Sequence, residues 1–461
     1  MNALLFAVSL IGCTTDTPDS DTEADTTPPP TWNRLRPRLD DAIAPVRGVV
    51  PSRVITHLHS PWSHDACDSE GYVDGVIDTA CLADLRRGLC EAGIDLAFMT
   101  DHPAHAAEQP YEELWHPQPG DDSVFLGDTA VGGFVPCDDG SQTAWLPGFE
   151  DELMPLGMQE HLPGDRAERE AAYNRSDIPT LRAMTDAGAM VFVAHTEQRA
   201  LDPLRVQRES GLVGVEIFNA HAMFAPNIRE EFLGLDGLGW LDAIGPFTRP
   251  DGTAEPDLLL MGVLDLQGPS IATFDALLAD GPVVGIAGTD AHQNVLGLEL
   301  RDGERLDSYR RALSWFSNYV YADDTTPAGI RAALGAGRSA VVFEVLGVPD
   351  GFDLYVEGDA GTAEMGSDFS GAGELVLDCP TVASSFPQGP DAPEITAIVL
   401  KDGNAWASGC GRHTLDGPGV YRAQVNIVPH HLTPFLGDSA ADFLHLYPWI
   451  LSNAIRVDME G

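Results

Sequence analysis

Histidines and carboxylates follow apolar, strand-like runs at several places in this chain. The first pair is His57 and His59, in the sequence HLH, and the last is Asp290 and His292, in DAH. Side chains two residues apart on a strand project to the same side, so each pair can hold a cation. Most of the other candidates also end an apolar run, and the full set of nine is His57, His59, Asp65, His102, Glu150, His161, His195, Asp290 and His292.

These side chains predict a metal centre with several ions. Mixed imidazole and carboxylate ligands suit Zn, Mn or Fe. The set contains no thiolate, which argues against a purely structural zinc site, and catalytic sites leave positions open for water. Metal coordination can lower the pKa of a bound water from 15.7 to about 7, which creates a hydroxide nucleophile at neutral pH. The predicted chemistry is therefore hydrolysis.

The ordered motifs resemble the PHP (polymerase and histidinol phosphatase) family of metallohydrolases. The matching stretches, which lie within residues 50–345, are HLHSPWSHD, MTDHP, PGFE followed by His161, AHTE, VEIFNAH and GTDAH. The resemblance implies that the nine side chains bind two or three divalent ions, with Glu150 as the bridge between them. It also implies that a metal-bridging hydroxide cleaves an ester, most often a phosphate ester.

The first motif departs from the pattern of many relatives. They read Ser-Asp-Gly where this chain has Ser-His-Asp-Ala at residues 63–66. Either His64 or Asp65 can therefore occupy the ligand position. Asp65 is favoured, because a hard carboxylate helps to neutralise clustered cations. His64 then becomes a nearby proton carrier or substrate contact.

Other residues near the motifs are expected to support the ligands. Asp101 precedes His102 and is expected to orient it or to bond a metal-bound water. Glu216 and Asn219, at the end of LVGVEIFN, match a motif near the site and are expected to hold ligands by hydrogen bonds instead of ligating. His105 and His221 are assigned to the surface or to similar support.

Two residues bear on the choice of substrate. Arg199, four residues after His195, is a candidate for phosphate recognition, which normally needs Arg or Lys near the metals. Trp62, beside the first motif, can instead form the floor of an apolar pocket for an aryl group. The sequence does not decide between these two substrate classes.

Strand-like and helix-like runs alternate over residues 48–345. This order predicts parallel strands with helical crossovers and a site at the carboxyl ends of the strands. The family resemblance implies a distorted seven-stranded (β/α)7 TIM-like barrel. Residues 230–268 are expected to form an insertion that could cap the pocket. The strand-like runs are RVITHLH, IDLAFMTD, MVFVAH, GVEIFN and VVGIAGTD, and the helix-like runs are CLADLRRGLCEAG, IPTLRAMTDAG, SIATFDALLADG, SYRRALSWFSNYV and PAGIRAALGAG.

From residue 350 to residue 461 the pattern changes to short alternating runs. FDLYVEG, GELVLDC, ITAIVLKDG and VYRAQVNIV are separated by Gly, Pro and Asp, which predicts a small C-terminal β-sandwich. This order of a barrel and a β domain resembles the CehA/McbA-like branch of PHP proteins, which includes carbamate and aryl-ester hydrolases.

The first 13 residues indicate export. The apolar stretch of MNALLFAVSLIGC is too short to span a bilayer, and its end, LIGC, looks like a bacterial lipobox with Cys13 as the lipidated residue. The next residues, 14–31, are polar, acidic and rich in proline, and residues 14–47 are assigned to a disordered tether. These features predict a lipoprotein that contacts the bacterial envelope only through its lipid anchor.

Six further cysteines are compatible with disulfides in an exported chain. Cys379 and Cys410 are the two in the last third of the sequence, so they are expected to pair and to contribute about 2 to 4 kcal/mol. The remaining four allow three sets of pairings, between which the sequence does not decide: Cys67, Cys81, Cys90 and Cys137.

Composition excludes one class of partner. The chain carries 26 basic and 71 acidic residues, a net charge of −45, and Lys401 is its single lysine. Such a surface repels polyanions, so no nucleic-acid partner is expected. The first hypothesis is a phosphoesterase that acts on a small molecule. The second is a carbamate or aryl carboxylic ester hydrolase with the same metal centre. The third is a non-catalytic metal- or ligand-binding surface lipoprotein, which is disfavoured because a scaffold needs no open metal positions.

Overall fold

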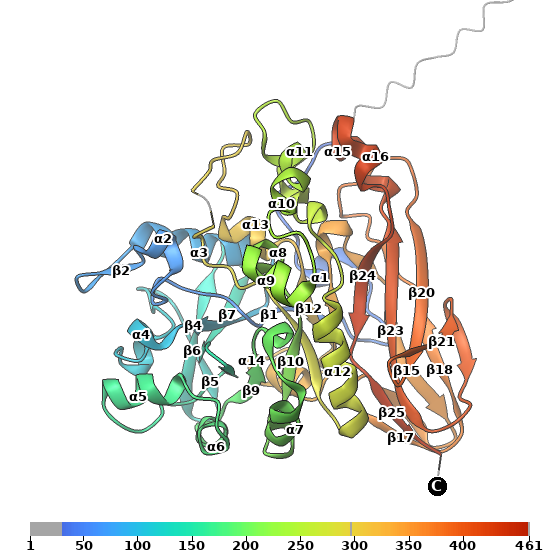
Figure 1. Cartoon of the computed structure of the whole chain (residues 1–461), viewed down its shortest axis with the longest axis horizontal. Helices are drawn as coiled ribbons and strands as arrows, with labels where there is room; N and C mark the ends of the chain where they lie inside the picture. Colours follow the sequence, from blue (N-terminus) through green and yellow to red (C-terminus); the bar gives the residue numbers. More distant parts are fainter. Residues whose placement is uncertain (1–29, 296, 460–461) are drawn as a thin grey trace, which may run out of the picture.

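A large mixed sheet of 17 strands runs through this mixed α/β protein, with helices around its first part and further strands beside its last part (Figure 1). The computed structural model describes residues 30–295 and 297–459. The predicted lipobox at Cys13 and residues 14–29 of the predicted tether lie outside the described residues. Within the described ranges, no helix has both the length and the apolar composition of a membrane span.

The first parallel group contains three strands. β1 (Ser52–Ile55) pairs with β4 (Leu96–Asp101), and β4 pairs with β7 (Gln142–Phe149), in both cases in parallel. Every residue of β1 and β4 is buried. Parallel strands covered on both faces are mostly apolar, as residues 96–99 of β4 are. In β1 the buried Arg53 is instead paired with Glu344 at 2.7 Å.

The second parallel group is β9 (Met190–Val193), β10 (Gly214–Asn219) and β11 (Val284–Gly288). The short strand β8 (Leu153–Leu156) joins the two groups and runs antiparallel to both β7 and β9. The apolar runs predicted from the sequence coincide with the parallel strands β1, β4, β9, β10 and β11 but do not include β7. The uniformly parallel order expected from the alternation does not hold at β8.

Backbone contacts beyond β1 and β11 bring the two ends of these groups together. Leu58 forms a parallel bridge with Ala291. The His59 amide donates to the Ala291 carbonyl at 3.1 Å, and the Asp290 amide donates to the His57 carbonyl at 3.0 Å. The first and last predicted ligand pairs therefore lie side by side, although more than 200 residues separate them in the chain.

The side-chain amide of Asn318 forms hydrogen bonds with the backbone of β11, as a neighbouring strand would. It lies on β12 (Ser317–Val320), which pairs antiparallel with both β1 and β13 (Ser339–Val342). The Ala287 amide donates to Asn318 Oδ1, and Asn318 Nδ2 donates to the Ala287 carbonyl, both at 2.9 Å. The Asn318 amide thus pairs with one backbone N–H and one backbone carbonyl of the buried strand β11. Leaving these two groups unpaired in the interior would cost free energy.

The prediction of a single helix over residues 308–320 is wrong. Helix α13 (Tyr309–Leu313) ends early, and the following residues form β12. All four residues of β12 are buried between β1 and β13, so strand pairing overrides the helical pattern of the sequence.

The other predicted helices occur where the sequence indicates them. Their ends have recognisable caps: Asp78 and Asp177 accept hydrogen bonds from the first turns of α3 and α6, and Thr326 does so for α14. The sequence analysis missed β7, β8 and further elements. They are strands β5 (Ser123–Leu126) and β6 (Thr129–Pro136) and helices α5 (Arg166–Tyr173) and α7 (Leu201–Glu209). The four predicted helices are α3 (Thr79–Glu91), α6 (Ile178–Asp186), α12 (Gly268–Asp280) and α14 (Pro327–Gly335).

The last part of the chain is rich in antiparallel strands, which lie on the right of Figure 1. One four-stranded sheet contains β15 (Asp353–Gly358), β16 (Gly361–Glu364), β18 (Gly373–Asp378) and β22 (Gly411–Thr414). Strands β14 (Pro349–Asp350) and β19 (Thr381–Val382) form a separate two-stranded sheet. Six further strands extend the large sheet through the pairing of β24 with β13, so the sheet continues across the boundary expected near residues 345–350. They are β17 (Asp368–Ser370), β20 (Glu394–Lys401), β21 (Asn404–Ser408), β23 (Gly419–Val428), β24 (Tyr447–Ser452) and β25 (Ile455–Asp458).

Residues 32–47, which the sequence assigns to the tether, contact the folded body. Trp32 Nε1 donates to Asp257 Oδ2 at 2.8 Å, and Arg38 pairs with Asp95 at 2.7 Å. Arg36 is buried and lies over the ring of Trp32. The packed part of the chain therefore begins before residue 48.

The segment 230–268 contains short helices, including α10 (Gly239–Ala243) and α11 (Gly245–Thr248). Its apolar run DLLLMGVL, which the sequence assigns to neither helix nor strand, forms most of the 3₁₀ helix η4 (Pro256–Gly262). Asp257 in η4 is buried between two arginines. Arg310 Nη1 donates to Asp257 Oδ2 at 3.0 Å, and Arg311 Nη1 donates to Asp257 Oδ1 at 2.5 Å.

We predict that Asp257→Ala strongly destabilises the protein. The substitution leaves two buried guanidinium groups without their shared carboxylate, and breaking a buried pair costs about 3 to 5 kcal/mol. Denaturant unfolding measures the loss. The control is Asp323→Ala, because Asp323 also pairs with an arginine but its side chain is 75% exposed. The control should lose less than about 1 kcal/mol, and equal losses in the two variants would contradict the prediction.

Candidate metal centre

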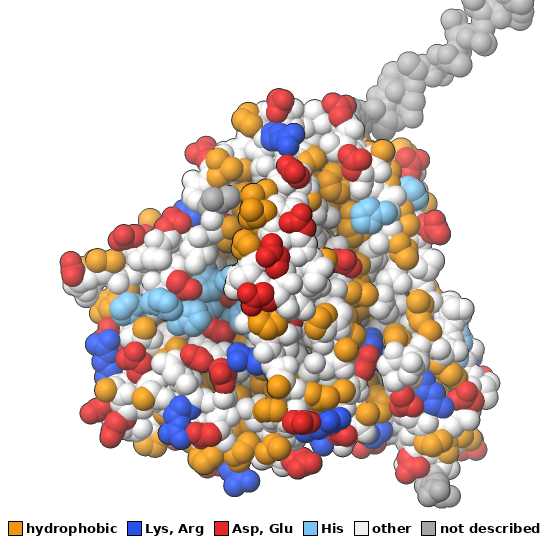
Figure 2. All heavy atoms as spheres, viewed as in Figure 1, with side chains coloured by type: hydrophobic (Ala, Val, Ile, Leu, Met, Phe, Trp, Pro, Cys, Tyr) orange, Lys and Arg blue, Asp and Glu red, His pale blue; other side chains and the backbone are white. Residues whose placement is uncertain are grey.

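Seven of the nine predicted ligands follow the ends of neighbouring strands. His57 and His59 follow β1, and Asp290 and His292 follow β11. His102, Glu150 and His195 lie just after β4, β7 and β9. Because these strands run in parallel within their groups, their carboxyl ends meet at one edge of the sheet. Figure 2 shows histidine side chains gathered in one patch on this face of the molecule.

Five of the histidines have one ring nitrogen held by the protein. In each case the held atom is Nδ1, and the partner is a carboxylate, a hydroxyl or a carbonyl oxygen. This arrangement fixes the orientation of a ring and leaves Nε2 for a metal. The five contacts are His57 with Glu216 Oε1 at 2.7 Å, His59 with Ser63 Oγ at 2.8 Å, His102 with Glu150 Oε2 at 2.9 Å, His195 with Glu197 Oε1 at 3.3 Å and His292 with the Asp290 carbonyl at 2.8 Å.

The free Nε2 atoms converge on carboxylates. His57 Nε2 lies 3.1 Å from His59 Nε2, and Asp290 Oδ1 lies 3.4 Å and 3.3 Å from these two atoms. His195 Nε2 lies 3.2 Å from Asp290 Oδ2 and 3.8 Å from Glu150 Oε1. Two ring nitrogens that face each other can share at most one proton, so this convergence favours a cation between them.

Asp65 lies on the other side of His59. Its Oδ2 atom is 3.5 Å from His102 Nε2 and 3.3 Å from His292 Nε2. Asp65 Oδ1 and His292 Nε2 are buried without a hydrogen-bond partner, which is costly unless another group satisfies them. These unsatisfied atoms fit a bound metal ion, and Asp65 is the residue of the first motif whose side chain lies among the candidate ligand atoms.

The candidate ligand atoms form three overlapping sets in the described part of the chain. Atoms within each set lie no more than 4.8 Å apart. Because His59 and His292 each belong to two sets, the sets adjoin, as a centre with several ions requires. The sets are His59, Asp65, His102 and His292; His57, His59 and Glu150; and His221, Asp290 and His292. A fourth acidic set contains Asp257 and Asp302, which already pair with arginines.

Opposite charges at the centre shift several pKa values. Burial opposes protonation of His57, but Asp290 and Glu216 raise its pKa to about 9. Burial opposes ionisation of Glu150, but His102 and His57 lower its pKa to about 2. Burial and the neighbouring His292 hold the pKa of His59 well below its usual value. The low pKa of Glu150 keeps its carboxylate ionised at neutral pH, and this negative charge attracts cations.

Glu216 and Asn219 form hydrogen bonds with several of the candidate ligands. Glu216 Oε1 contacts His57, and Glu216 Oε2 accepts a hydrogen bond from the His195 backbone amide at 2.9 Å. Asn219 Nδ2 donates to Glu216 Oε2 at 3.0 Å and to Asp290 Oδ2 at 3.2 Å. Both side chains therefore form hydrogen bonds to candidate ligands.

Asp101 bonds to Ser60 and not to the ring of its neighbour His102. The Ser60 amide and hydroxyl donate to its two oxygens at 2.6 Å and 2.7 Å. Burial raises the pKa of Asp101 to about 6. Ser60 Oγ also lies 2.7 Å from Nε2 of the buried His116, which stacks on Trp62. Asp101 and Trp62 therefore belong to a buried network beneath the centre, and no sequence motif marks His116.

His161 lies outside the three sets of ligand atoms. Its Nε2 contacts the Gln109 carbonyl at 2.9 Å, and its Nδ1 contacts the Tyr173 hydroxyl at 3.1 Å. Both ring nitrogens are thus engaged by the protein, so the structure does not bring this predicted ligand into the group. Burial lowers the pKa of His161 to about 4.

His221, which the sequence assigns to the surface or to support, joins one of the sets. Its Nδ1 lies 3.4 Å from Asp290 Oδ2, and its side chain is half exposed. The available signal was its place in VEIFNAH, two residues after Asn219. His64 is exposed, and its ring centroid lies 5.0 Å from that of His102. Arg199 contacts Glu152 at 3.5 Å and the Ala194 carbonyl at 3.3 Å.

An unusual backbone turn follows Asp65. Cys67, Asp68 and Ser69 have φ values of 56°, 58° and 64°. The left-handed conformation costs roughly 1–2 kcal/mol for each such residue, so the surroundings must hold it in place. The Cys67 amide donates to the His292 carbonyl at 2.8 Å, and the Asp68 amide donates to the Gln293 carbonyl at 3.0 Å. The turn after one ligand therefore rests on the loop that carries another.

The described chain contains three disulfides. Cys379 pairs with Cys410, as the sequence predicts. The four earlier cysteines, for which the sequence leaves three alternatives, pair as Cys67–Cys81 and Cys90–Cys137.

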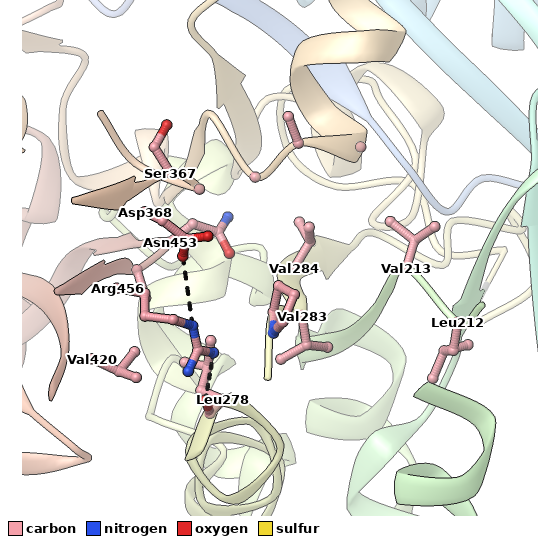
Figure 3. Close-up of a pocket in the computed structure, with 16 residues that line it drawn as sticks. Leu212, Val213, Leu278, Val283, Val284, Ser367, Asp368, Val420, Asn453 and Arg456 are labelled. Atoms are coloured by element: carbon pink, nitrogen blue, oxygen red, sulfur yellow. Dashed lines mark hydrogen bonds and ion pairs between the residues drawn. The ribbon is translucent and has the colours of Figure 1, made fainter. Parts of the chain in front are cut away.

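Two cavities differ in their relation to the centre. One is mainly apolar and adjoins His221, Asp290 and His292, with walls from Phe224, Leu306, Ala312 and Trp315. The other, of about 340 Å³, lies near the amino ends of β10 and β11, away from the ligands (Figure 3). There Arg456 donates to the Leu278 carbonyl at 2.9 Å and lies 3.7 Å from Asp368. The first cavity is therefore the one placed to receive part of a substrate.

No known sequence family and no curated protein matches this chain. Two solved structures show a distant likeness. One is a two-domain protein with a predicted PHP-like metal-dependent phosphoesterase from Bacteroides vulgatus ATCC 8482, at 12% identity and a TM-score of 0.37, covering 91% of this chain and 99% of that chain. The other is PsfC from Pseudomonas syringae PB-5123, at 13% identity and a TM-score of 0.36, covering 64% of this chain and 93% of that chain. TM-scores this low do not establish a shared fold.

We predict that Glu216→Gln weakens metal binding about 10- to 100-fold, because the ring of His57 loses its anionic partner. Competition with a chromophoric chelator measures the change. The control is Glu357→Gln on β15, whose carboxylate pairs with an exposed arginine. The prediction fails if Glu216→Gln binds metal as tightly as the control does.

Proposed function

We propose that this chain is a PHP-type metal-dependent hydrolase that cleaves a small-molecule phosphate ester. The observation that carries the proposal is the convergence of histidine Nε2 atoms, each on a ring whose Nδ1 the protein holds. Supporting observations are the buried carboxylates beside them and the unsatisfied atoms of Asp65 and His292. A protein that only binds a partner would not need overlapping sets of ligand atoms. It would also not need solvent-exposed histidines, such as His64 and His221, beside them.

The described residues suggest how the work is divided. His57, His59, Asp65, His102, Glu150, His195, Asp290 and His292 would hold two or three ions of Zn, Mn or Fe, with His221 at the edge. Bound divalent ions supply a nucleophile at neutral pH and stabilise charge on the leaving oxygen. Glu216 and Asn219 fix the ligand rings and carboxylates. His64 is exposed beside His102 and is placed to carry a proton to or from solvent.

Arg199 supports the choice of a phosphate ester. Its guanidinium contacts Glu152, whose side chain is 50% exposed, and this weak surface contact can yield to an anionic substrate. A guanidinium presents donors in the geometry of phosphate oxygens. Arg199 Nε also donates to the carbonyl of Ala194, the residue before His195, at 3.3 Å, which places Arg199 beside the segment that carries a candidate ligand.

The apolar cavity beside His292 favours a second candidate substrate, a carbamate or aryl carboxylic ester. Phe224, Leu306 and Trp315 line this cavity, and apolar walls of this kind bind hydrocarbon groups. Such a substrate would use the same metal centre and would not need Arg199.

We further propose that the catalytic part is a (β/α)7-type barrel followed by a β-sandwich, and that the protein is lipid-anchored at Cys13 in the bacterial cell envelope. The three disulfides support an oxidising, extracytoplasmic location. The net charge of −45 disfavours a nucleic-acid partner.

The first test combines metal analysis with a substrate screen on the chain from residue 30 onward. We expect two to three ions per chain and turnover of a chromogenic phosphate monoester or diester. Chelation should abolish turnover, and the metal should restore it. Asp290→Asn should reduce kcat/KM by at least about 100-fold while the protein stays folded, because Asp290 contacts five candidate ligand rings. Less than one ion per chain with no turnover would favour the binding lipoprotein.

We predict that Arg199→Gln separates the two substrate classes. If the substrate is a phosphate ester, kcat/KM should fall about 10- to 100-fold because a charge-assisted contact is lost. Turnover of an aryl carbamate should stay within about twofold. Arg166→Gln is the matched control, because Arg166 is an exposed arginine that pairs with Glu108. An aryl carbamate turned over better than every phosphate ester would replace the first candidate with the second.

A further inference from the structure

We propose that the Cys67–Cys81 disulfide is a positioning device for Asp65, so that the oxidation state of this pair determines how tightly the centre holds the ion on its Asp65 side. The inference rests on the proposed metal centre and adds a chemical control to it. No residue of the disulfide is itself a ligand in this account.

The Asp65 side chain has little support of its own. It makes no cap hydrogen bond to the short turn that follows it, and its Oδ1 atom has no hydrogen-bond partner. The other ligands differ in this respect, because their rings are held at Nδ1 and Asp290 accepts from Asn219. The position of Asp65 therefore depends on the backbone that carries it.

That backbone is held in a conformation that it would not keep alone. Cys67, Asp68 and Ser69 are consecutive left-handed residues, and none of them is glycine. Consecutive left-handed residues with side chains are disfavoured by steric contact, so they relax when their restraints are removed. Because Asp65 lies directly before this turn, relaxation would move its carboxylate relative to His102 and His292.

The disulfide is the covalent restraint on this turn. It joins Cys67 to Cys81 in the first turn of α3, and both residues are buried. Cys81 Sγ lies 3.9 Å from the Tyr309 hydroxyl, which donates to the carbonyl of the ligand His59 at 3.0 Å. The crosslink thus fastens the turn to elements that also hold other ligands.

Non-covalent contacts also hold the turn. The amides of Cys67 and Asp68 bond to the loop of His292, and Arg305 forms an ion pair with Asp68 at 2.6 Å. These contacts would keep the turn near its place after the crosslink is broken, but less tightly. We therefore expect weakened metal binding and not unfolding.

The redox step is a two-electron exchange. A dithiol reductant supplies two electrons and two protons, the Cys67–Cys81 bond breaks into two thiols, and the reductant closes into a cyclic disulfide. Reoxidation reverses the step and restores the restraint.

The chain provides a matched control on the same helix. Cys90, in the last turn of α3, pairs with Cys137, which directly follows β6. This second crosslink restrains the opposite end of α3 and contacts no candidate ligand in the described structure. Removing it also lowers stability, since disulfides that close longer loops restrict the unfolded chain more.

The test compares the double variants Cys67→Ala/Cys81→Ala and Cys90→Ala/Cys137→Ala with the wild-type chain. Zn²⁺ affinity and stoichiometry are measured by chelator competition, and Tm is measured separately. Both variants should melt at lower temperature. Only the Cys67–Cys81 variant should lose affinity for its weakest ion, by about 10- to 100-fold, the size expected when support of a ligand is removed.

A double-mutant cycle with Asp65→Asn tests whether the disulfide acts through Asp65. In the Asp65→Asn background, removing Cys67 and Cys81 should have no further effect on Zn²⁺ affinity. Additive losses would show a general structural role and overturn the proposal.

Partial reduction of the wild-type chain by a dithiol gives the same readout should the variant fold poorly. Zn²⁺ release should follow the fraction of reduced Cys67 and Cys81, and not that of Cys379 and Cys410. Full metal binding by the Cys67–Cys81 variant, or equal losses in both variants, would overturn the inference while leaving the hydrolase intact. A wild-type chain that binds no Zn²⁺ would overturn both.

Discussion

The backbone pairing between the residues after β1 and those after β11 is the contact on which the centre depends. Two hydrogen bonds, from Asp290 to His57 and from His59 to Ala291, place the first and last ligand pairs together. The amide of Asn318 supports this contact by completing the edge of β11. Without these hydrogen bonds, no backbone contact would hold the first and last ligand pairs next to each other.

Bringing many carboxylates and imidazoles into a buried site is costly, and the fold offsets this cost with hydrogen bonds. Glu216 contacts the ring of His57 and the backbone of His195, and Asn219 links Glu216 to Asp290. The same principle applies further away, where Arg310 and Arg311 surround Asp257. In both places, the buried charged groups are held in networks in which each member has more than one partner.

Much of the candidate site could be predicted because its ligands directly follow apolar runs. A buried strand needs a continuous apolar sequence, and the polar residue at its end is therefore conspicuous, as at His102 and His195. His161 shows the limit of this reasoning. The sequence does not indicate whether the ring nitrogen of a loop histidine contacts a metal or, as here, the carbonyl of Gln109. His116 was missed because a buried network beneath the centre leaves no periodic pattern.

The sequence by itself determined the residue types of the centre, most helices and parallel strands, and the pairing of Cys379 with Cys410, since these depend on local order and simple counting. Tertiary structure decided the antiparallel direction of β8, the change from helix to strand at β12 and the choice among the remaining disulfides. It also decided that His221 lies among the candidate ligand atoms and that His161 lies outside them. These outcomes depend on which distant segments share a surface, and hydrophobic patterning specifies that a residue is buried but not what it is buried against.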